Sequence, residues 1–347
     1  MGDVPFHPLP VRDGLNPTRL VLPHDPASVA RWSTALEYLL ARFPDDADRL
    51  LEKVGAGEVV TGRGEPVDAR TPYEPRGFLF LYRDAPADEP QVPALTQIEV
   101  LHRDEDLLVV DKPHLVATMP RGRWVTQTVL THLRRTLDLP ELSPAHRLDR
   151  PTAGVLVLTV RPRVRGAYQE LFARRQVTKV YEAVAPLPAP GSEPPGGFPT
   201  TVRSRIVKQR GVAAAQEVPG EPNAESRVDL VARDEARGVG LYRLEPHTGK
   251  THQLRLHMAS LGLPILHDPF WPVLRPDGDE DPARPLQLLA RSLTFTDPLS
   301  GAERRFVSRR ALAASPVGAA QRPAPRAAQA VPGAQPGAGT GTAAPAR

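Results

Sequence analysis

The sequence predicts an α+β protein with a central mixed, mostly antiparallel sheet flanked by helices, preceded by a small N-terminal α/β module. Three observations predict this fold. Residues 226–231 and 240–244 alternate apolar and polar side chains, as strands with one covered face do. Residues 126–137 and 166–175 instead repeat apolar side chains at helical spacing. The uncharged run from Val155 to Thr159 is typical of a strand buried on both faces.

The N-terminal region begins with an arm and continues as two helices and short strands. Residues 1–28 carry six prolines and no sustained periodicity, so we expect an extended arm without a helix. Apolar residues from 29 to 43 recur every three or four positions and predict an amphipathic helix. A second helix fits residues 46–54, and short strands fit the valine pair Val59 and Val60 and residues 78–82. The module is therefore expected to span residues 29–84.

The main domain is expected to follow a linker rich in proline and acid at residues 85–94. It runs over residues 95–312, and its further strands are expected at residues 98–102, 107–110 and 179–183, with a proline and glycine loop at 186–199. Beyond it, residues 313–347 are mostly alanine, proline, glycine and glutamine. Such a composition offers too few large apolar groups to offset chain entropy, so we expect a disordered tail.

Composition limits the chemistry of the 347-residue chain. The chain has no cysteine, which excludes disulfides, thiol nucleophiles and cysteine-ligated zinc or iron–sulfur sites. No apolar run approaches the roughly 20 residues of a membrane span, and the N-terminus lacks the pattern of a signal peptide. We therefore expect a cytoplasmic protein, a monomer without a membrane partner, whose chemistry uses oxygen and nitrogen groups.

Local clusters of positive charge are more informative than the net charge of +4. Three arginines lie in the tail, which has no acid, so the body of the protein is close to neutral. Within the body, six basic residues face one acid between Arg161 and Lys179, and four basic residues between Arg203 and Arg210 face none. Either cluster could follow a phosphate backbone, and either could be a solvated helix face or loop.

One carboxylate, that of Asp149, stands in a polar turn immediately before the buried run at Val155. Arg147 and Arg150 flank it, and their positive charges favour the ionised form. An ionised aspartate held at the floor of a cleft is a candidate nucleophile. From these residues alone, the other interpretation is a surface turn in which Asp149 pairs with an arginine.

A second dense segment spans residues 245–268 and contains histidines at 247, 252 and 257. Steps of five residues turn successive side chains to different directions on a helix and to opposite faces on a strand, so we expect no metal site. Residues 248–251 instead predict a turn that enters a helix, where Lys250 and the first N–H groups would favour a phosphate. An ordinary capped helix is the other interpretation.

Four motifs in order resemble those of the RluA-type pseudouridine synthases. They are H-R-L-D-R-P-T-A-G at residues 146–154, V-T-K-V-Y-E-A at 177–183, H-T-G-K-T-H-Q-L-R-L-H at 247–257 and V-V-D-K-P at 109–113. The run at residues 286–301 is similar to the motif that ends the domain. The two helices and valine pair of the N-terminal module also resemble a degenerate form of the small ribosomal-protein (S-four) RNA-binding module, which often precedes modification enzymes.

The resemblance implies an enzyme that isomerises uridine to pseudouridine in structured RNA without a metal or organic cofactor. It implies that Asp149 is the catalytic nucleophile, that Tyr181 stacks on the target base and that Arg255 pairs with the aspartate. It also implies that Arg147 fills the gap left by a flipped base, and we expect Lys250 and His252 to contact the RNA. An enzyme acting on a base in a helix must extrude it, so these roles suit the reaction.

Several questions stay open at this level. The sequence departs from the family pattern at Ala153, Lys250, His267 and Gln287, which leaves substrate choice undetermined. We expect ribosomal RNA to be favoured over transfer RNA as the partner. Addition of the aspartate to the ribose and abstraction of a proton are both open routes. Two other functions are an RNA-binding protein on the same scaffold, and a carboxylate hydrolase. The hydrolase needs a second carboxylate, which the sequence does not identify, since Asp268 and Glu245 are only guesses.

Overall fold

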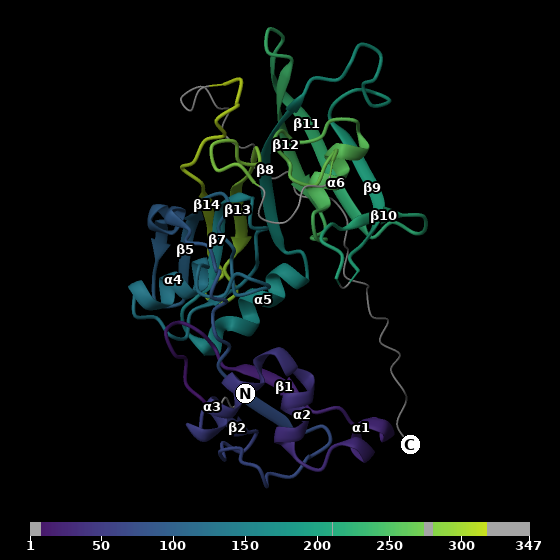
Figure 1. Ribbon diagram of the computed structural model, residues 1–347. Helices are drawn as coiled ribbons and strands as arrows, with labels where there is room; N and C mark the ends of the chain where they lie inside the picture. Colours follow the sequence, from purple (N-terminus) through teal and green to yellow (C-terminus); the bar gives the residue numbers. More distant parts are fainter. Residues whose placement is uncertain (1–7, 210, 274–279, 318–347) are drawn as a thin grey trace, which may run out of the picture.

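The computed structural model describes residues 8–209, 211–273 and 280–317. Two sheets organise them, one of three strands and one of eleven. Figure 1 shows the N-terminal part of the chain beneath the larger sheet, which continues upward through the strands drawn in teal and green. The part of the expected tail after residue 317 lies outside the described residues. No helix in the described ranges is long and apolar enough to cross a membrane.

The small N-terminal sheet has the order β1-β3-β2, and all of its pairs are antiparallel. Its strands are β1 (Thr18–Val21), β2 (Val59–Thr61) and β3 (Phe78–Leu81). Its helices are α1 (Pro26–Arg31), α2 (Ala35–Arg42) and α3 (Ala47–Gly55), with a 3-10 helix at Pro44–Asp46. Leu39, Leu50, Val59 and Leu79 are buried together between the helices and the sheet.

Two elements differ from the expected arm and helix. The arm contains strand β1, which pairs with an edge of β3, and helix α1, which starts at Pro26. The expected helix of residues 29–43 is interrupted before Thr34. There the hydroxyl of Thr34 accepts the N–H of Glu37 while the Glu37 carboxylate accepts the N–H of Thr34, which closes a capping box and starts a new helix.

The large sheet has the order β10-β9-β11-β12-β8-β13-β7-β5-β4, with β14 beside β13 and β6 beside β7. Only the β7 and β13 pair is parallel among the described strands, so the expected mixed, mostly antiparallel sheet is confirmed. Its strands are β4 (Glu99–Arg103), β5 (Leu107–Lys112), β6 (Ser143–Pro144), β7 (Ala153–Thr159), β8 (Val177–Pro186), β9 (Thr200–Val207), β10 (Gln216–Val218), β11 (Ala224–Asp234), β12 (Val239–Pro246), β13 (Leu288–Thr296) and β14 (Glu303–Val307).

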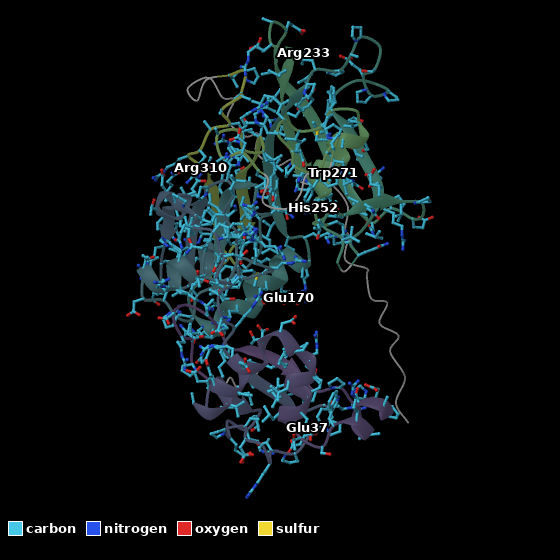
Figure 2. The ribbon with its side chains drawn as sticks, viewed as in Figure 1. Glu37, Glu170, Arg233, His252, Trp271 and Arg310 are labelled. Atoms are coloured by element: carbon cyan, nitrogen blue, oxygen red, sulfur yellow. The ribbon has the colours of Figure 1, made fainter. Side chains whose placement is uncertain are left out.

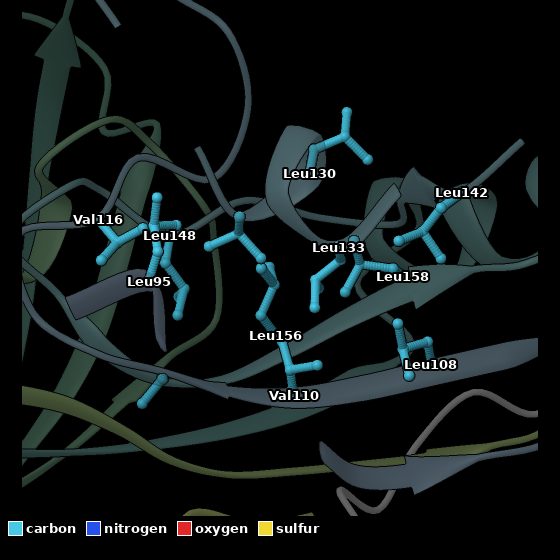
Figure 3. Close-up of a cluster of buried hydrophobic side chains, with 12 residues drawn as sticks. Leu95, Leu108, Val110, Val116, Leu130, Leu133, Leu142, Leu148, Leu156 and Leu158 are labelled. Carbon is cyan, nitrogen blue, oxygen red and sulfur yellow. The ribbon is translucent and has the colours of Figure 1, made fainter. Parts of the chain in front are cut away.

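Three helices cover this sheet: α4 (Val129–Thr136), α5 (Arg165–Ala173) and α6 (Gln253–Ser260). Short 3-10 helices lie at Pro93–Gln97 and Pro162–Val164. The side chains of β7 alternate between two cores, which confirms that this strand is buried on both faces. Leu156 and Leu158 pack with α4, as Figure 3 shows, whereas Val155 and Val157 pack on the side of α5.

The short parallel contact between β7 and β13 brings the two halves of the sheet together next to the Asp149 turn. Gly154 faces Ala290 there with φ +115°, and a Cβ at Gly154 would lie 2.2 Å from the Ala290 carbonyl oxygen. No side chain other than glycine fits this position. The glycine of the A-G pair therefore allows β7 to meet β13 while the residues just before it form a loop.

Part of the basic cluster between Arg203 and Arg210 forms strand β9, which was not among the strands expected from the sequence. Arg203 and Arg205 are exposed on one face, while Val202, Ser204 and Ile206 are covered on the other. Strand alternation thus explains the spacing of these arginines, and the Arg203 side chain pairs with Glu225 on β11. Residue 210 lies outside the described residues.

Candidate active site

The Asp149 turn is held by hydrogen bonds to the backbone on both sides of the carboxylate. The Thr118 hydroxyl donates to the Leu148 carbonyl at 2.8 Å and accepts the Leu148 N–H at 3.2 Å. The Thr152 N–H donates to the Asp149 carbonyl at 3.0 Å. These contacts fix the direction in which the Asp149 side chain leaves the loop, as a preorganised nucleophile requires.

A buried ammonium group supports the same loop from below. Lys112 ends strand β5, and its Nζ donates to the carbonyl oxygens of Pro113, Val116 and Arg150 at 2.7 to 3.1 Å. Burial lowers the pKa of Lys112 well below its usual value, and the nearby charge of Asp149 acts in the opposite direction. Lys112 thus joins the end of β5 to the Asp149 loop.

The Asp149 side chain, a quarter exposed, lines a cavity of about 300 Å³. The walls come from the Asp149 loop, the start of α6 and strand β8, and they include Phe172, Tyr181, Lys250 and Leu288. Among the described residues that line this cavity, Asp149 is the only carboxylate. Asp268 and Glu245, the two candidates for a second catalytic carboxylate, are absent from this lining.

Tyr181 forms one wall of the cavity from the middle of β8, where it pairs with Leu244 and Ala290 on the neighbouring strands. Its half-buried ring packs against the apolar clusters on both sides. Burial raises the pKa of Tyr181, and the charge of Asp149 raises it further, so the phenol stays neutral. A flat, fixed aromatic ring next to the carboxylate is suited to stacking on a base.

Arg255 lies beside Asp149, but its main partner is a different carboxylate. Its Nη1 is 4.0 Å from Asp149 Oδ2, whereas its Nε and Nη2 donate to the two oxygens of Asp268 at 2.8 and 2.5 Å. Both side chains of this bidentate pair are 1% exposed. The structure thus brings Arg255 to the aspartate, as the resemblance implies, and adds Asp268 as the residue that holds the guanidinium in place.

His252 also points at the Asp149 carboxylate, with Nε2 4.0 Å from Oδ2. Its Nδ1 accepts the N–H of Ala215 at 3.2 Å, which leaves the proton of the neutral ring on Nε2. Burial lowers the pKa of His252 to about 4, despite the opposing effect of Asp149. The ring lies beside Trp271, with centroids 5.8 Å apart, and Figure 2 labels the two side chains next to each other.

Basic side chains without a carboxylate partner in the described residues surround this cavity. Arg147 and Lys250 are exposed at its rim, and Lys179 stands on β8. Burial, together with the charge of Arg175, lowers the pKa of Lys179. Cations without a carboxylate partner around a single carboxylate are suited to binding phosphate groups.

The three histidines of the second motif segment lie in different surroundings. His247 is exposed, His252 faces Asp149, and His257 is buried with its Nε2 3.1 Å from the Ser204 hydroxyl. Within the described ranges, no group of three or more histidine, cysteine or acidic side chains could hold a metal ion.

Sequence reasoning did not assign roles to Asp268, Lys112 and Thr118. Lys112 carried a signal, because a lysine directly before proline at the end of an otherwise apolar strand is unusual in a core. Asp268 stood out only as a guess for a second carboxylate. Thr118 carries no pattern of its own, because its role depends on the approach of the loop to Leu148.

Residues 106–260 match the sequence profile of the RNA pseudouridylate synthase family. The chain is 33% identical over 222 residues to an uncharacterised RNA pseudouridine synthase of Synechocystis, which covers 62% of this chain and 72% of that protein. It is 32% identical over 224 residues to the dual-specificity RNA pseudouridine synthase RluA of Escherichia coli strain K12, covering 62% and 94%. The solved structure of human RNA pseudouridylate synthase domain containing 4 aligns with a TM-score of 0.47 at 27% identity, covering 62% of this chain and 89% of that one. The chain belongs to the RNA pseudouridine synthase family, whose members are isomerases that convert uridine to pseudouridine in RNA.

Proposed function

We propose that the protein isomerises specific uridines in structured RNA with Asp149 as its nucleophile and without a cofactor. The observation that carries this proposal is the isolation of the Asp149 carboxylate, alone among the described acidic residues in a cavity walled by Tyr181 and rimmed by unpaired cations. The target uridine is flipped out of its helix and stacks on Tyr181. Arg147, Lys250 and His252 contact the RNA around it, with Arg147 in the gap left by the base.

In this reaction the bond between ribose C1′ and base N1 breaks, and a bond between C1′ and C5 of the same base forms. The C5 hydrogen leaves as a proton, and N1 gains one, so no electrons or groups are exchanged with another molecule. Asp149 acts either by adding to C1′ or by removing a proton from the adjacent ribose carbon. His252 Nε2 and Arg255 Nη1, each 4.0 Å from Asp149 Oδ2, stabilise its charge before the base arrives.

Ribosomal RNA is the favoured partner, ahead of transfer RNA. Helices α2 and α3 next to strands β2 and β3 fit the resemblance of the N-terminal module to an S-four-like RNA-binding module. The same part of the chain makes many internal ion pairs, which suits a degenerate module that packs on the catalytic domain. Because the Escherichia coli relative is described as dual-specificity, both ribosomal and transfer RNA should be tested as substrates.

A carboxylate hydrolase is disfavoured because neither Asp268 nor Glu245 lines the cavity that Asp149 shares with Tyr181. Asp268 is buried and bonded to Arg255, so it is committed to a structural pair. Glu245 lies on β12 opposite Arg227 of β11. Neither residue faces Asp149 across the cavity, as two hydrolytic carboxylates must.

Release of tritium from RNA labelled at C5 of uridine tests the proposal. Ribosomal and transfer RNA are purified separately from a strain that lacks this gene and incubated with the wild type or with Asp149→Ala. Release by the wild type alone, and faster from ribosomal RNA, is the expected result. If neither protein released tritium but both still bound RNA, the catalytic proposal would be overturned in favour of an RNA-binding protein.

A further inference from the structure

A second cavity, of about 370 Å³, lies on the other side of the Asp149 loop. It shares Arg147, Asp149, His252 and Arg255 with the first cavity, so the two spaces meet at the proposed nucleophile. Its other walls include residues 117–119 and 121–124, Lys208 with residues 211–213, and Phe270. Its volume lies in the usual range of ligand sites. Tyr181 belongs to the first cavity alone, so the second cavity is not needed for the target base.

The wall of this second cavity contains a cation stacked on an aromatic ring. The Arg150 guanidinium lies 4.8 Å from the centroid of the half-buried Trp124 ring, and Arg150 also pairs with Glu280. Indole and guanidinium are both planar groups on which an unpaired RNA base stacks. We refer to Trp124 and Arg150 together as the stacking pair.

The charges around the stacking pair favour a phosphate. The exposed side chain of Arg121 and those of Arg147 and Lys208 line the cavity and have no carboxylate partner among the described residues. Its two carboxylates are Asp149, the proposed nucleophile, and Glu280, which Arg150 neutralises. An anion entering beside Trp124 therefore meets an excess of positive charge.

The loop that carries Trp124 is braced from behind by the segment that joins the two parts of the protein. Arg121 and Trp124 exchange backbone hydrogen bonds that close the loop into a tight turn. Arg83 donates to the Gly122 carbonyl at 2.6 Å. The Glu89 carboxylate accepts the N–H groups of Val125, Thr126 and Gln127 at 2.6 to 2.9 Å. The cavity wall is thus held in place before any RNA binds, which lowers the entropic cost of binding.

We propose that this second cavity binds the nucleotide adjacent to the target uridine, with its base on the stacking pair and its phosphate near Arg121 and Lys208. The inference rests on the proposed function, because it assigns the neighbour of a uridine held against Tyr181 and Asp149. Stacking tolerates every base, so the site orients the RNA strand without reading its sequence. Arg147, which lines both cavities, separates the two nucleotides.

A fluorescent base placed next to the target uridine tests this assignment. The probe is a stem-loop of about 20 nucleotides around the uridine mapped by tritium release, with 2-aminopurine immediately 5′ or 3′ of it. Wild type is expected to quench the fluorescence in one of the two positions because the base stacks. Trp124→Ala should abolish the quenching and weaken binding by about tenfold. Trp124→Phe should retain most of both effects, since it restores an aromatic ring.

Phe78→Ala is the matched control, since Phe78 is an exposed ring with an arginine, Arg19, 5.0 Å from its centroid in the N-terminal module. It should behave as the wild type, and circular dichroism verifies that every variant is folded. Equal quenching by wild type and Trp124→Ala, or none in either position, would overturn the second site while tritium release leaves the proposed function intact. Absence of tritium release by the wild type would instead overturn the proposed function.

Discussion

The basic side chains of the N-terminal module and those of the catalytic cavities differ in what they contact. In the N-terminal region, Arg12 pairs with Glu58, Arg49 with Glu52 and Asp84, and Arg63 with Glu65 and Glu74, all within 3.3 Å. Around Asp149, the cations at positions 121, 147, 179, 208 and 250 have no carboxylate partner in the described parts of the chain. Three arginines of the N-terminal region are thus held by carboxylates, whereas these five cations around Asp149 are not.

This difference shows why composition alone could not locate the RNA site. A cation already held by a carboxylate must break that contact before it binds a phosphate, whereas an unpaired cation releases counterions directly. Other arginines of the module lie over aromatic rings, as Arg31 does over Trp32 and Arg42 over Phe43. Under the proposed function, RNA recognition is therefore expected around Asp149.

The largest expected effect is on the rate of tritium release, which should depend on Asp149 but not on Asp84 of the N-terminal module. Asp149→Asn keeps the shape of the loop but removes the charge, so tritium release should fall by about a thousandfold or more while RNA binding persists. Asp84→Asn is the matched change, because Asp84 also lies between two cations, Arg49 and Lys53. Its rate should equal that of the wild type. Equal rates for Asp149→Asn and wild type would show that the two carboxylates do not differ in function.

Breaking a buried ion pair near Asp149 should cost more unfolding free energy than breaking an exposed ion pair in the N-terminal module. Asp268→Ala leaves the Arg255 guanidinium, 1% exposed, without its bidentate partner, so urea unfolding should show a loss of about 3–5 kcal/mol. Glu74→Ala, which removes the exposed partner of Arg63, should leave the unfolding midpoint within error. The Arg255→Met/Asp268→Leu double variant should recover much of the lost stability without recovering activity. Equal costs for the buried and the exposed change would contradict this comparison.

Elements with a strong local pattern were predictable from the sequence. The buried strand β7, the helices α3, α4 and α5, and the alternating strands β11 and β12 all lie near their expected positions. Their signals are local, because the helical or alternating spacing of apolar residues is visible within each segment alone. The Asp149 turn was equally visible, because a polar turn directly precedes an uncharged strand.

Contacts between distant segments were not predictable in the same way. Strand β1 lies in a proline-rich arm and forms because the edge of β3 is free to pair with it. The second cavity joins residues near 121, 150 and 208, which no single stretch of sequence brings together. The Asp268 side chain reaches Arg255 from the loop after α6, so the sequence gives proximity along the chain but not the bidentate geometry.

Buried histidines should make the catalytic domain sensitive to acid at a higher pH than carboxylates would. Burial lowers the pKa of His114, His252 and His257 to about 4 and that of His146 to about 3. In the unfolded chain these groups take up protons near pH 6.5, so the folded state loses stability as the pH falls from 6.5 towards 4. Each histidine contributes at most about 1.4 kcal/mol per pH unit in that window.

Urea unfolding at pH 7, 6 and 5 measures this effect. The free energy of unfolding should decrease at each step, and His257→Gln should reduce the decrease, because glutamine keeps a polar group beside Ser204 but does not titrate. His24→Gln serves as the control from the N-terminal region, since the His24 side chain is exposed. A pH-independent free energy between 7 and 5 would show that the four imidazoles are as accessible to protons as those of the unfolded chain.

The smallest expected effect tests the difference in charge directly. Lys250→Ala removes an exposed, unpaired cation from the rim of the first cavity, so the RNA affinity should fall by about threefold to tenfold at 0.1 M salt. The slope of log K against log salt should become shallower by about 0.7 to 0.9, the contribution of one phosphate contact. Arg63→Ala removes a cation of equal charge whose guanidinium is already held by Glu65 and Glu74, and it should change neither the affinity nor the slope. Titrations at four salt concentrations measure the two slopes. Equal slopes for the two variants would mean that the module's cations also leave their partners to bind RNA, and the division of roles between the two regions would then be wrong.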